Sequence, residues 1–179
     1  WDGERSGPFA SNLALARVRR GRNVGLLTDG FSSLTFPQSV LAAMRDGVTV
    51  PAEGGEIRFA ATPAFDLEPE GEPEWLSAEQ SNSTVIIGQQ AVLKLLRKLA
   101  PGVHPDAEMA RYLGENGFAN VPAVLGTVTR VEESGEETLL MIAQAFVYNQ
   151  GDGWQWTLNA LERLATDTDW SFSNYENFA

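Results

Sequence analysis

The chain has 179 residues, of which 43% are hydrophobic and 21% charged, enough apolar side chains for a folded core. Its 13 Lys and Arg against 24 Asp and Glu give a net charge of −11, which disfavours binding to nucleic acid or membrane surfaces. Without cysteine there are no disulfides or thiolate sites, and the single histidine, His104, excludes a histidine-based metal cluster. No signal peptide or membrane-spanning run is recognisable, so we expect a cytoplasmic protein, and the first residue, Trp1, suggests a piece of a longer polypeptide.

Charge and composition change near residue 68. Residues 1–68 carry 7 basic and 8 acidic side chains, whereas residues 69–179 carry 6 and 16. The segment Phe65–Trp75, with two prolines and a glycine, has no apolar periodicity. We therefore expect a cap subdomain over residues 1–68, and over residues 69–166 a lobe with its linker and the start of the next helix. Residues 167–179 form an aromatic tail of unknown role.

The first 68 residues predict a small α+β unit. Alternation over residues 12–19, a turn at Gly21 and a second apolar run over residues 23–28 indicate a β-hairpin. Thr35 as N-cap with Pro37 in the first turn predicts a short helix that ends at Gly47. We expect a turn over residues 51–55 and a strand over residues 56–61.

The second part predicts five antiparallel strands and one helix. The helix follows Pro105 and ends at Gly117, between the third and fourth strands. The strands are predicted over residues 75–78, 83–87, 91–96, 124–130 and 138–146, and a further helix over residues 154–165. The predicted fold class is therefore α+β: a protein-kinase-like small lobe, with a five-stranded antiparallel sheet and one helix, preceded by the small α+β cap subdomain.

Lys94 is the candidate phosphate-binding residue. Alternation along AVLKLL places it with Val92 and Leu96 on one face of a strand, a lone ammonium among apolar side chains. A lysine used in this way needs a carboxylate from the following helix to hold it, and Glu108 is the candidate. The alternative is an exposed lysine that protects an edge strand from aggregation.

The polar loop before this strand is a second candidate. Ser81, Asn82, Ser83 and Thr84 offer hydroxyl and backbone N–H groups to phosphates, although GxGxxG is absent. By local pattern alone, a polar hairpin turn is the better interpretation.

Longer stretches carry a specific resemblance. The segments EQSNST, VLKLLRKL, PGVHPDAEMARYL and NQGDGW resemble the N-terminal lobe of bacterial maltokinases, including those fused behind a trehalose synthase. LALARVRRGRNVGLLTDG and the residues after it are similar to the cap subdomain of the same enzymes, so the resemblance spans most of the chain.

The resemblance implies an aminoglycoside-phosphotransferase-like fold and ATP-dependent formation of maltose 1-phosphate, in trehalose-to-glycogen metabolism. It places Lys94 on the α- and β-phosphates, Glu108 beside Lys94, and the phosphate loop at residues 81–84. Val92 would pack on adenine. Gln144, Ala145 and Val147 would belong to the interlobe linker, with adenine bonded by backbone groups of Ala145 and Val147.

Such kinases keep the catalytic aspartate and the Mg²⁺ ligands in a second lobe, which would follow this chain. We therefore expect the isolated chain to be inactive, with no catalytic or metal-binding residue of its own. The alternative function is a non-catalytic docking module of a trehalose synthase and maltokinase assembly. A stand-alone sugar-binding protein is a third possibility.

Three other features have ordinary structural interpretations. His104 is expected to begin a helix rather than to catalyse. The arginines near Gly21 are expected to be solvated rather than to dock a partner; they are Arg17, Arg19, Arg20 and Arg22. Trp154 and Trp156 could stack on a sugar, but a tryptophan at a helix start more often joins a core.

Overall fold

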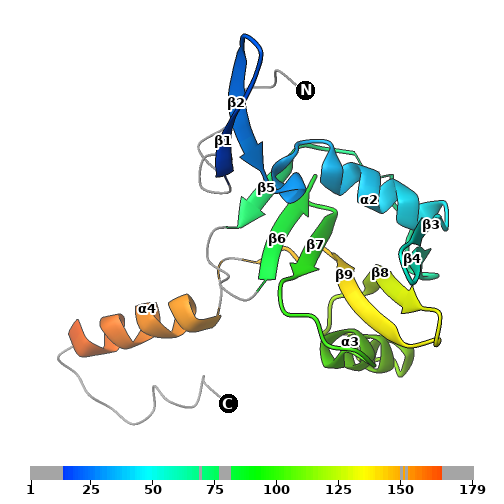
Figure 1. The fold of residues 1–179 in the computed structure, drawn as a ribbon. Helices are drawn as coiled ribbons and strands as arrows, with labels where there is room; N and C mark the ends of the chain where they lie inside the picture. The colour runs from blue at the N-terminus through cyan, green and yellow to red at the C-terminus, as the bar shows by residue number, and fades with distance from the viewer. Residues whose placement is uncertain (1–13, 69, 77–81, 150, 152, 167–179) are drawn as a thin grey trace. The chain divides into compact units, whose positions relative to one another are not determined.

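The computed structural model describes residues 14–68, 70–76, 82–149, 151 and 153–166, so the tail expected over residues 167–179 lies outside the described residues. The chain forms two compact units, residues 1–146 and residues 147–179. The described part of the first unit holds a two-stranded sheet, a seven-stranded sheet, a 3-10 helix and two α-helices (Figure 1). The structure is α+β, as predicted, with mainly antiparallel sheet.

The predicted N-terminal hairpin is confirmed. Strands β1 (Ala14–Arg20) and β2 (Asn23–Thr28) are antiparallel, and the turn between them uses Gly21 at a φ of 62°, a conformation that suits glycine. The four arginines of this segment are exposed, in agreement with the solvated interpretation. A short 3-10 helix, η1 (Gly30–Ser32), follows directly.

Helix α2 (Phe36–Arg45) begins where Thr35 and Pro37 predicted it. The Thr35 hydroxyl makes no cap hydrogen bond, however, because it lies 3.2 Å from the Ser33 hydroxyl instead. After the helix, β3 (Thr49–Ala52) and β4 (Gly55–Ala61) form a hairpin. The turn expected over residues 51–55 is confined to residues 53–54, because Pro51 and Ala52 lie in β3 and Gly55 begins β4. Strand β3 is at the edge of the sheet, where a missing backbone N–H is tolerated.

The five strands expected after residue 68 are all present. They are β5 (Pro73–Leu76), β6 (Asn82–Ile87), β7 (Ala91–Leu96), β8 (Val124–Glu132) and β9 (Glu137–Ala145). The sheet has seven strands rather than five, in the order β3-β4-β8-β9-β7-β6-β5, because β4 pairs with β8. The boundary expected near residue 68 therefore falls in the connection between two strands of one sheet.

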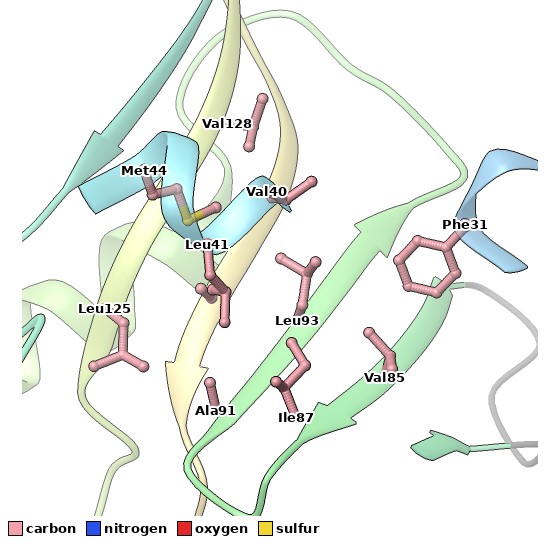
Figure 2. Close-up of a cluster of buried hydrophobic side chains, with 11 residues drawn as sticks. Phe31, Val40, Leu41, Met44, Val85, Ile87, Ala91, Leu93, Leu125 and Val128 are labelled. Atoms are coloured by element: carbon pink, nitrogen blue, oxygen red, sulfur yellow. The ribbon is translucent and has the colours of Figure 1, made fainter. Parts of the chain in front are cut away.

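Helix α2 covers one face of this sheet and supplies part of the main core. Figure 2 shows Leu41 and Met44 of α2 beside Leu93, Leu125 and other buried side chains of the strands. Phe31 of η1 belongs to the same cluster, so segments on both sides of residue 68 share one core.

Helix α3 (Pro105–Glu115) packs on the opposite face. Its buried residues, Ala107 and Ala110, join a second cluster with Leu96, Val124 and Ile142 of the sheet. Consecutive strand residues point to opposite faces, and Leu125 and Ala143 indeed belong to the first cluster. His104 caps this helix, since its Nδ1 accepts a hydrogen bond from the Asp106 backbone N–H at 3.3 Å. The predicted structural role of His104 is therefore confirmed.

The described part of the second unit contains helix α4 (Gly153–Thr166), as predicted after the NQGDG break. Its first turn is held by a hydrogen bond from the Thr157 hydroxyl to the Gly153 carbonyl. Trp154 is 72% exposed and Trp156 is 54% exposed, and the interpretation of these tryptophans as core residues stays a prediction. No helix in the described residues is both long and apolar enough to cross a bilayer.

Candidate functional site

Lys94 lies in the middle of β7, in the interior of the sheet. It is paired with Thr84 on β6 and with Ile142 on β9. Ile142 belongs to the α3-side cluster, and side chains paired directly across antiparallel strands share a face, so Lys94 lies on the α3 side. The edge-strand alternative is thereby excluded, because β7 has a neighbouring strand on each side.

Lys94 is half-buried, and its side chain makes no hydrogen bond or ion pair with another described residue. Val92, two residues earlier on β7, lies on the same face and pairs with Gln144 of β9. The predicted grouping of Val92, Lys94 and Leu96 on one face of the strand is therefore confirmed, since Leu96 also belongs to the α3-side cluster. A cation among apolar neighbours on a sheet face is suited to an anionic ligand, because little else competes for its charge.

The polar residues expected to bind phosphate divide between the two faces. Ser81 lies outside the described residues, whereas Asn82, Ser83 and Thr84 form the first half of β6. Thr84 faces the Lys94 side but is only 2% exposed. Ser83 faces the α2 side, where its hydroxyl binds the guanidinium of Arg97. Asn82 is on the Lys94 face by alternation, so it has the most suitable placement of the three for a ligand.

Glu108 is on α3, on the same side of the sheet as Lys94, but no ion pair joins these two residues in the described part of the chain. Glu108 lines a cavity of about 550 Å³ together with Arg111 and Glu137, and Lys94 is not among the lining residues. Ala107 and Ala110 of α3 are buried against the sheet, whereas Glu108 is exposed and lines this cavity. The Lys94–Glu108 pair stays a prediction.

The expected linker begins at the end of β9. The Ala145 backbone N–H donates to the Ala123 carbonyl at 2.8 Å, and the Phe146 N–H donates to the Gln90 carbonyl at 2.9 Å. The Ala145 N–H is therefore already used. To bond to Ala145, adenine would have to donate a hydrogen bond to its carbonyl, or the hydrogen bond between Ala145 and Ala123 would have to break. Val147 is the first residue of the second unit, and its carbonyl accepts from the Asn149 side chain at 3.1 Å.

One ion pair lies behind the candidate site, on the α2 face. The Arg97 guanidinium, at the end of β7, binds the Asp29 carboxylate at 2.6 Å. Burial raises the pKa of Asp29, but the backbone N–H of Phe31 and the bond and charge of Arg97 outweigh burial, so this pKa lies below its usual value. Sequence reasoning missed this pair, since its members are 68 residues apart.

The described residues contain no group of three or more His, Asp or Glu side chains that could hold a metal ion. We assign these residues no step through Mg²⁺.

Comparison with known proteins identifies the fold. No family model matches the chain. The chain is 32% identical over 92 residues to a glucosamine kinase from Mycolicibacterium smegmatis, a match covering 51% of this chain and 23% of that protein. It is 31% identical over 132 residues to a glucosamine kinase from Streptacidiphilus jiangxiensis, covering 67% of this chain and 30% of that protein. The chain thus spans less than a third of these relatives.

Similar solved structures are also of glucosamine kinases. A structure described as glucosamine kinase in complex with glucosamine, ADP and inorganic phosphate matches with a TM-score of 0.52 and 25% identity. The match covers 83% of this chain and 33% of that chain. A second crystal form of a glucosamine kinase matches with a TM-score of 0.52 at 22% identity, which supports the fold alone. The chain has a sugar kinase-like fold. The more specific resemblance to maltokinases is not supported by these names.

Proposed function

We propose that this chain is the nucleotide-binding part of an ATP-dependent sugar kinase. The observation that carries the proposal is the likeness, over 83% of the chain, to a solved glucosamine kinase described with ADP and glucosamine. The half-buried Lys94 supports it, because a cation set on a sheet face of an otherwise acidic protein is where a triphosphate would be attracted.

In this proposal the chain's own residues bind and orient the nucleotide. Lys94 holds the α- and β-phosphate oxygens, and Asn82 and the backbone of Thr84 line the phosphate path beside it. Val92 packs on adenine, while Gln144, Ala145 and Val147 lead into the linker. Mg²⁺ neutralises phosphate charge when it is bound. Its ligands and the catalytic base are proposed to lie in a part of the protein outside this chain.

The acceptor we propose first is glucosamine, since both named relatives and the solved neighbours are glucosamine kinases. Maltose, with maltose 1-phosphate as product, is the second acceptor, based on the resemblance of EQSNST and PGVHPDAEMARYL to maltokinases. The full-length protein should be incubated with ATP and each sugar separately, and the product identified by ³¹P NMR. Transfer to neither sugar would remove both acceptors.

The lysine assignment is tested in the full-length protein with Lys94→Met, which keeps the apolar stem and removes the charge. We expect kcat to fall by about 100-fold or more, as is typical when one charge-stabilising group is removed, with little change in the sugar KM. Lys98→Met is the matched control, because Lys98 is exposed and follows β7. Wild-type kcat in Lys94→Met would contradict the assignment.

The orienting role proposed for Glu108 needs its own variant. Glu108→Gln should lower kcat less than Lys94→Met does, and the two effects should be non-additive, because Glu108 has nothing to orient once the ammonium is gone. Since Glu108 and Lys94 are apart in this structure, the pair would form when nucleotide binds. Additive effects of the two substitutions would exclude this role.

A docking module, with a trehalose synthase domain as partner, is the second candidate function. It is favoured by apolar side chains exposed on the N-terminal hairpin, where Leu15 is 72% exposed and Leu27 is 52% exposed. Titration of the 179-residue chain with ATP separates the two functions. Binding in the millimolar range or tighter, without turnover, supports the kinase part; no binding supports docking.

A further inference from the structure

A three-residue cluster lies on the back of the β6–β7 strand pair, and the proposed function does not use it. The Arg97 guanidinium donates from Nε at 2.9 Å and from Nη2 at 2.7 Å to the Ser83 hydroxyl, and from Nη1 at 2.6 Å to the Asp29 carboxylate. Ser83 is on β6, Arg97 follows β7, and Asp29 follows β2. Three segments distant in the sequence therefore meet at one side chain.

The Asp29 end of this cluster is firmly held. One oxygen of its carboxylate accepts the backbone N–H of Phe31 at 2.9 Å, so Asp29 also caps η1. Phe31 is buried in the main core, and its carbonyl accepts a hydrogen bond from the Trp75 indole at 2.9 Å. Asp29 thus has a fixed position relative to the core, and it fixes Arg97 in turn.

The Ser83 end lies directly behind the candidate nucleotide face. Ser83 pairs with Leu95 and points to the α2 side, whereas the next residue, Thr84, pairs with Lys94 on the α3 side. Backbone movement at Ser83 would therefore also move Asn82 and Thr84 relative to the Lys94 ammonium. The position of the phosphate-binding strand end depends on what holds Ser83.

We infer that Arg97 is a positioning residue for nucleotide binding, and that Asp29, Arg97 and Ser83 act as a clamp that fixes the start of β6 against Lys94. This inference rests on the proposed function. Arg97 touches no nucleotide in it and acts only through Ser83. The guanidinium is suited to the task because its planar fork binds two partners at once, which a lysine ammonium does not reproduce.

The clamp differs from a purely stabilising contact in what its loss should change. Arg97 and Asp29 have side chains 39% and 26% exposed, and ion pairs at such sites contribute little to global stability. A displacement of the strand end, in contrast, acts directly on the position of bound phosphates, and small misplacements have large effects there. Loss of the clamp should therefore weaken ATP binding more than it weakens the fold.

The test uses Arg97→Lys in the full-length protein, with Arg45→Lys as the matched control. Arg45 is equally exposed and bridges Asp46 at 2.9 Å and Glu68 at 2.8 Å, away from β6. We expect Arg97→Lys to raise the ATP KM by about 3- to 10-fold, with the sugar KM and Tm nearly unchanged, a loss of roughly 0.6–1.4 kcal/mol of binding. Arg45→Lys should leave all three quantities unchanged.

Two further variants test the contributions of Ser83 and Asp29 to the clamp. Ser83→Ala should raise the ATP KM in the same direction, and combining it with Arg97→Lys should add little. Asp29→Asn keeps the acceptor for the Phe31 N–H and should have a smaller effect, so it also serves if Arg97→Lys fails to fold. An unchanged ATP KM in the folded variants would overturn the inference. So would a joint change of ATP KM, sugar KM and Tm, because that indicates a structural role alone.

Hydrogen exchange distinguishes a failure of the proposed nucleotide-binding function from a failure of the positioning role of Arg97. Amide exchange over residues 82–87 should become faster in Arg97→Lys than in wild type, and stay unchanged in Arg45→Lys, with or without nucleotide. If wild type binds no ATP, the proposed function fails, and with it the positioning role. Faster exchange would then still show that Arg97 holds β6. If ATP binds but exchange is unchanged, the clamp alone is overturned.

Discussion

Gly126 on β8 lies where α2 packs against the sheet, and we predict that Gly126→Ala destabilises the fold. A Cβ at this position would lie 2.7 Å from the Ala60 carbonyl oxygen and 2.9 Å from the Met44 sulfur. Met44 is fully buried, with 0% exposure, so its side chain has little room to retreat. The Ala60 carbonyl is in β4, which is hydrogen-bonded to β8 at this point, so it moves only with its strand.

Inserting a methyl group into such a contact costs about 1–3 kcal/mol, and we expect about 2 because one of the two obstacles is backbone. For a protein of this size that corresponds to a Tm lower by roughly 4–8 °C. The assay is thermal unfolding of the 179-residue chain by circular dichroism, supported by urea unfolding.

Gly114→Ala on α3 is the matched control. No atom lies within 4 Å of a Cβ built at Gly114, and its backbone is helical, so alanine should stabilise the helix by about 0.5–1 kcal/mol. The two glycine-to-alanine changes should thus act in opposite directions. A Gly126→Ala chain that melts within about 1 °C of wild type would refute the packing of α2 on β8, since an expected loss of 2 kcal/mol would be missing.

The core and one carboxylate give further predictions, all measured by urea unfolding. Leu93→Ala, which truncates a side chain with 0% exposure, should cost about 2–5 kcal/mol. Because the pKa of Asp29 is lowered in the folded state, its ionised form stabilises the fold fully above its unfolded pKa of about 3.9. This contribution is lost as the pH falls through the lower folded pKa, so the difference in unfolding free energy between wild type and Asp29→Asn should be largest near pH 7 and should shrink as the pH falls below about 3.9. A constant difference would contradict the assignment. His104→Ala should cost about 1 kcal/mol through loss of the α3 cap.

Most of the secondary structure was predictable because it is determined by signals in the local sequence, such as apolar alternation in strands and start and stop residues in helices. Alternation along AVLKLL fixed β7, and the Thr35 to Pro37 start and Gly47 fixed α2. The strand at Pro51 was missed because proline and a nearby glycine predict a turn equally well, and only the edge position of β3 in the sheet permits it. That position depends on pairing between β4 and β8, which are far apart in the sequence.

The candidate site was predictable in part for the same reason. The faces of Lys94 and Val92 follow from period-two alternation alone. Alternation could also have separated Ser83 from Asn82 and Thr84, once β6 was known to extend back to Asn82. The position of Glu108 relative to Lys94 could not be predicted from the sequence, because it depends on how α3 packs on the sheet through Ala107 and Ala110.

The contacts of the N-terminal segment with the sheet bear on how the candidate site is held. Four core residues that precede residue 68 are buried against side chains of β6, β7 and β8. They are Phe31, Val40, Leu41 and Met44. The opposite face of β6 carries Thr84, and the opposite face of β7 carries Lys94. The N-terminal segment therefore packs on the back of the strands that carry the candidate site, through α2 and through the contact of Asp29 with Arg97. Asp29, which directly follows the N-terminal hairpin, binds Arg97, and Arg97 binds Ser83, so two hydrogen-bonded contacts connect the end of the hairpin to the start of β6.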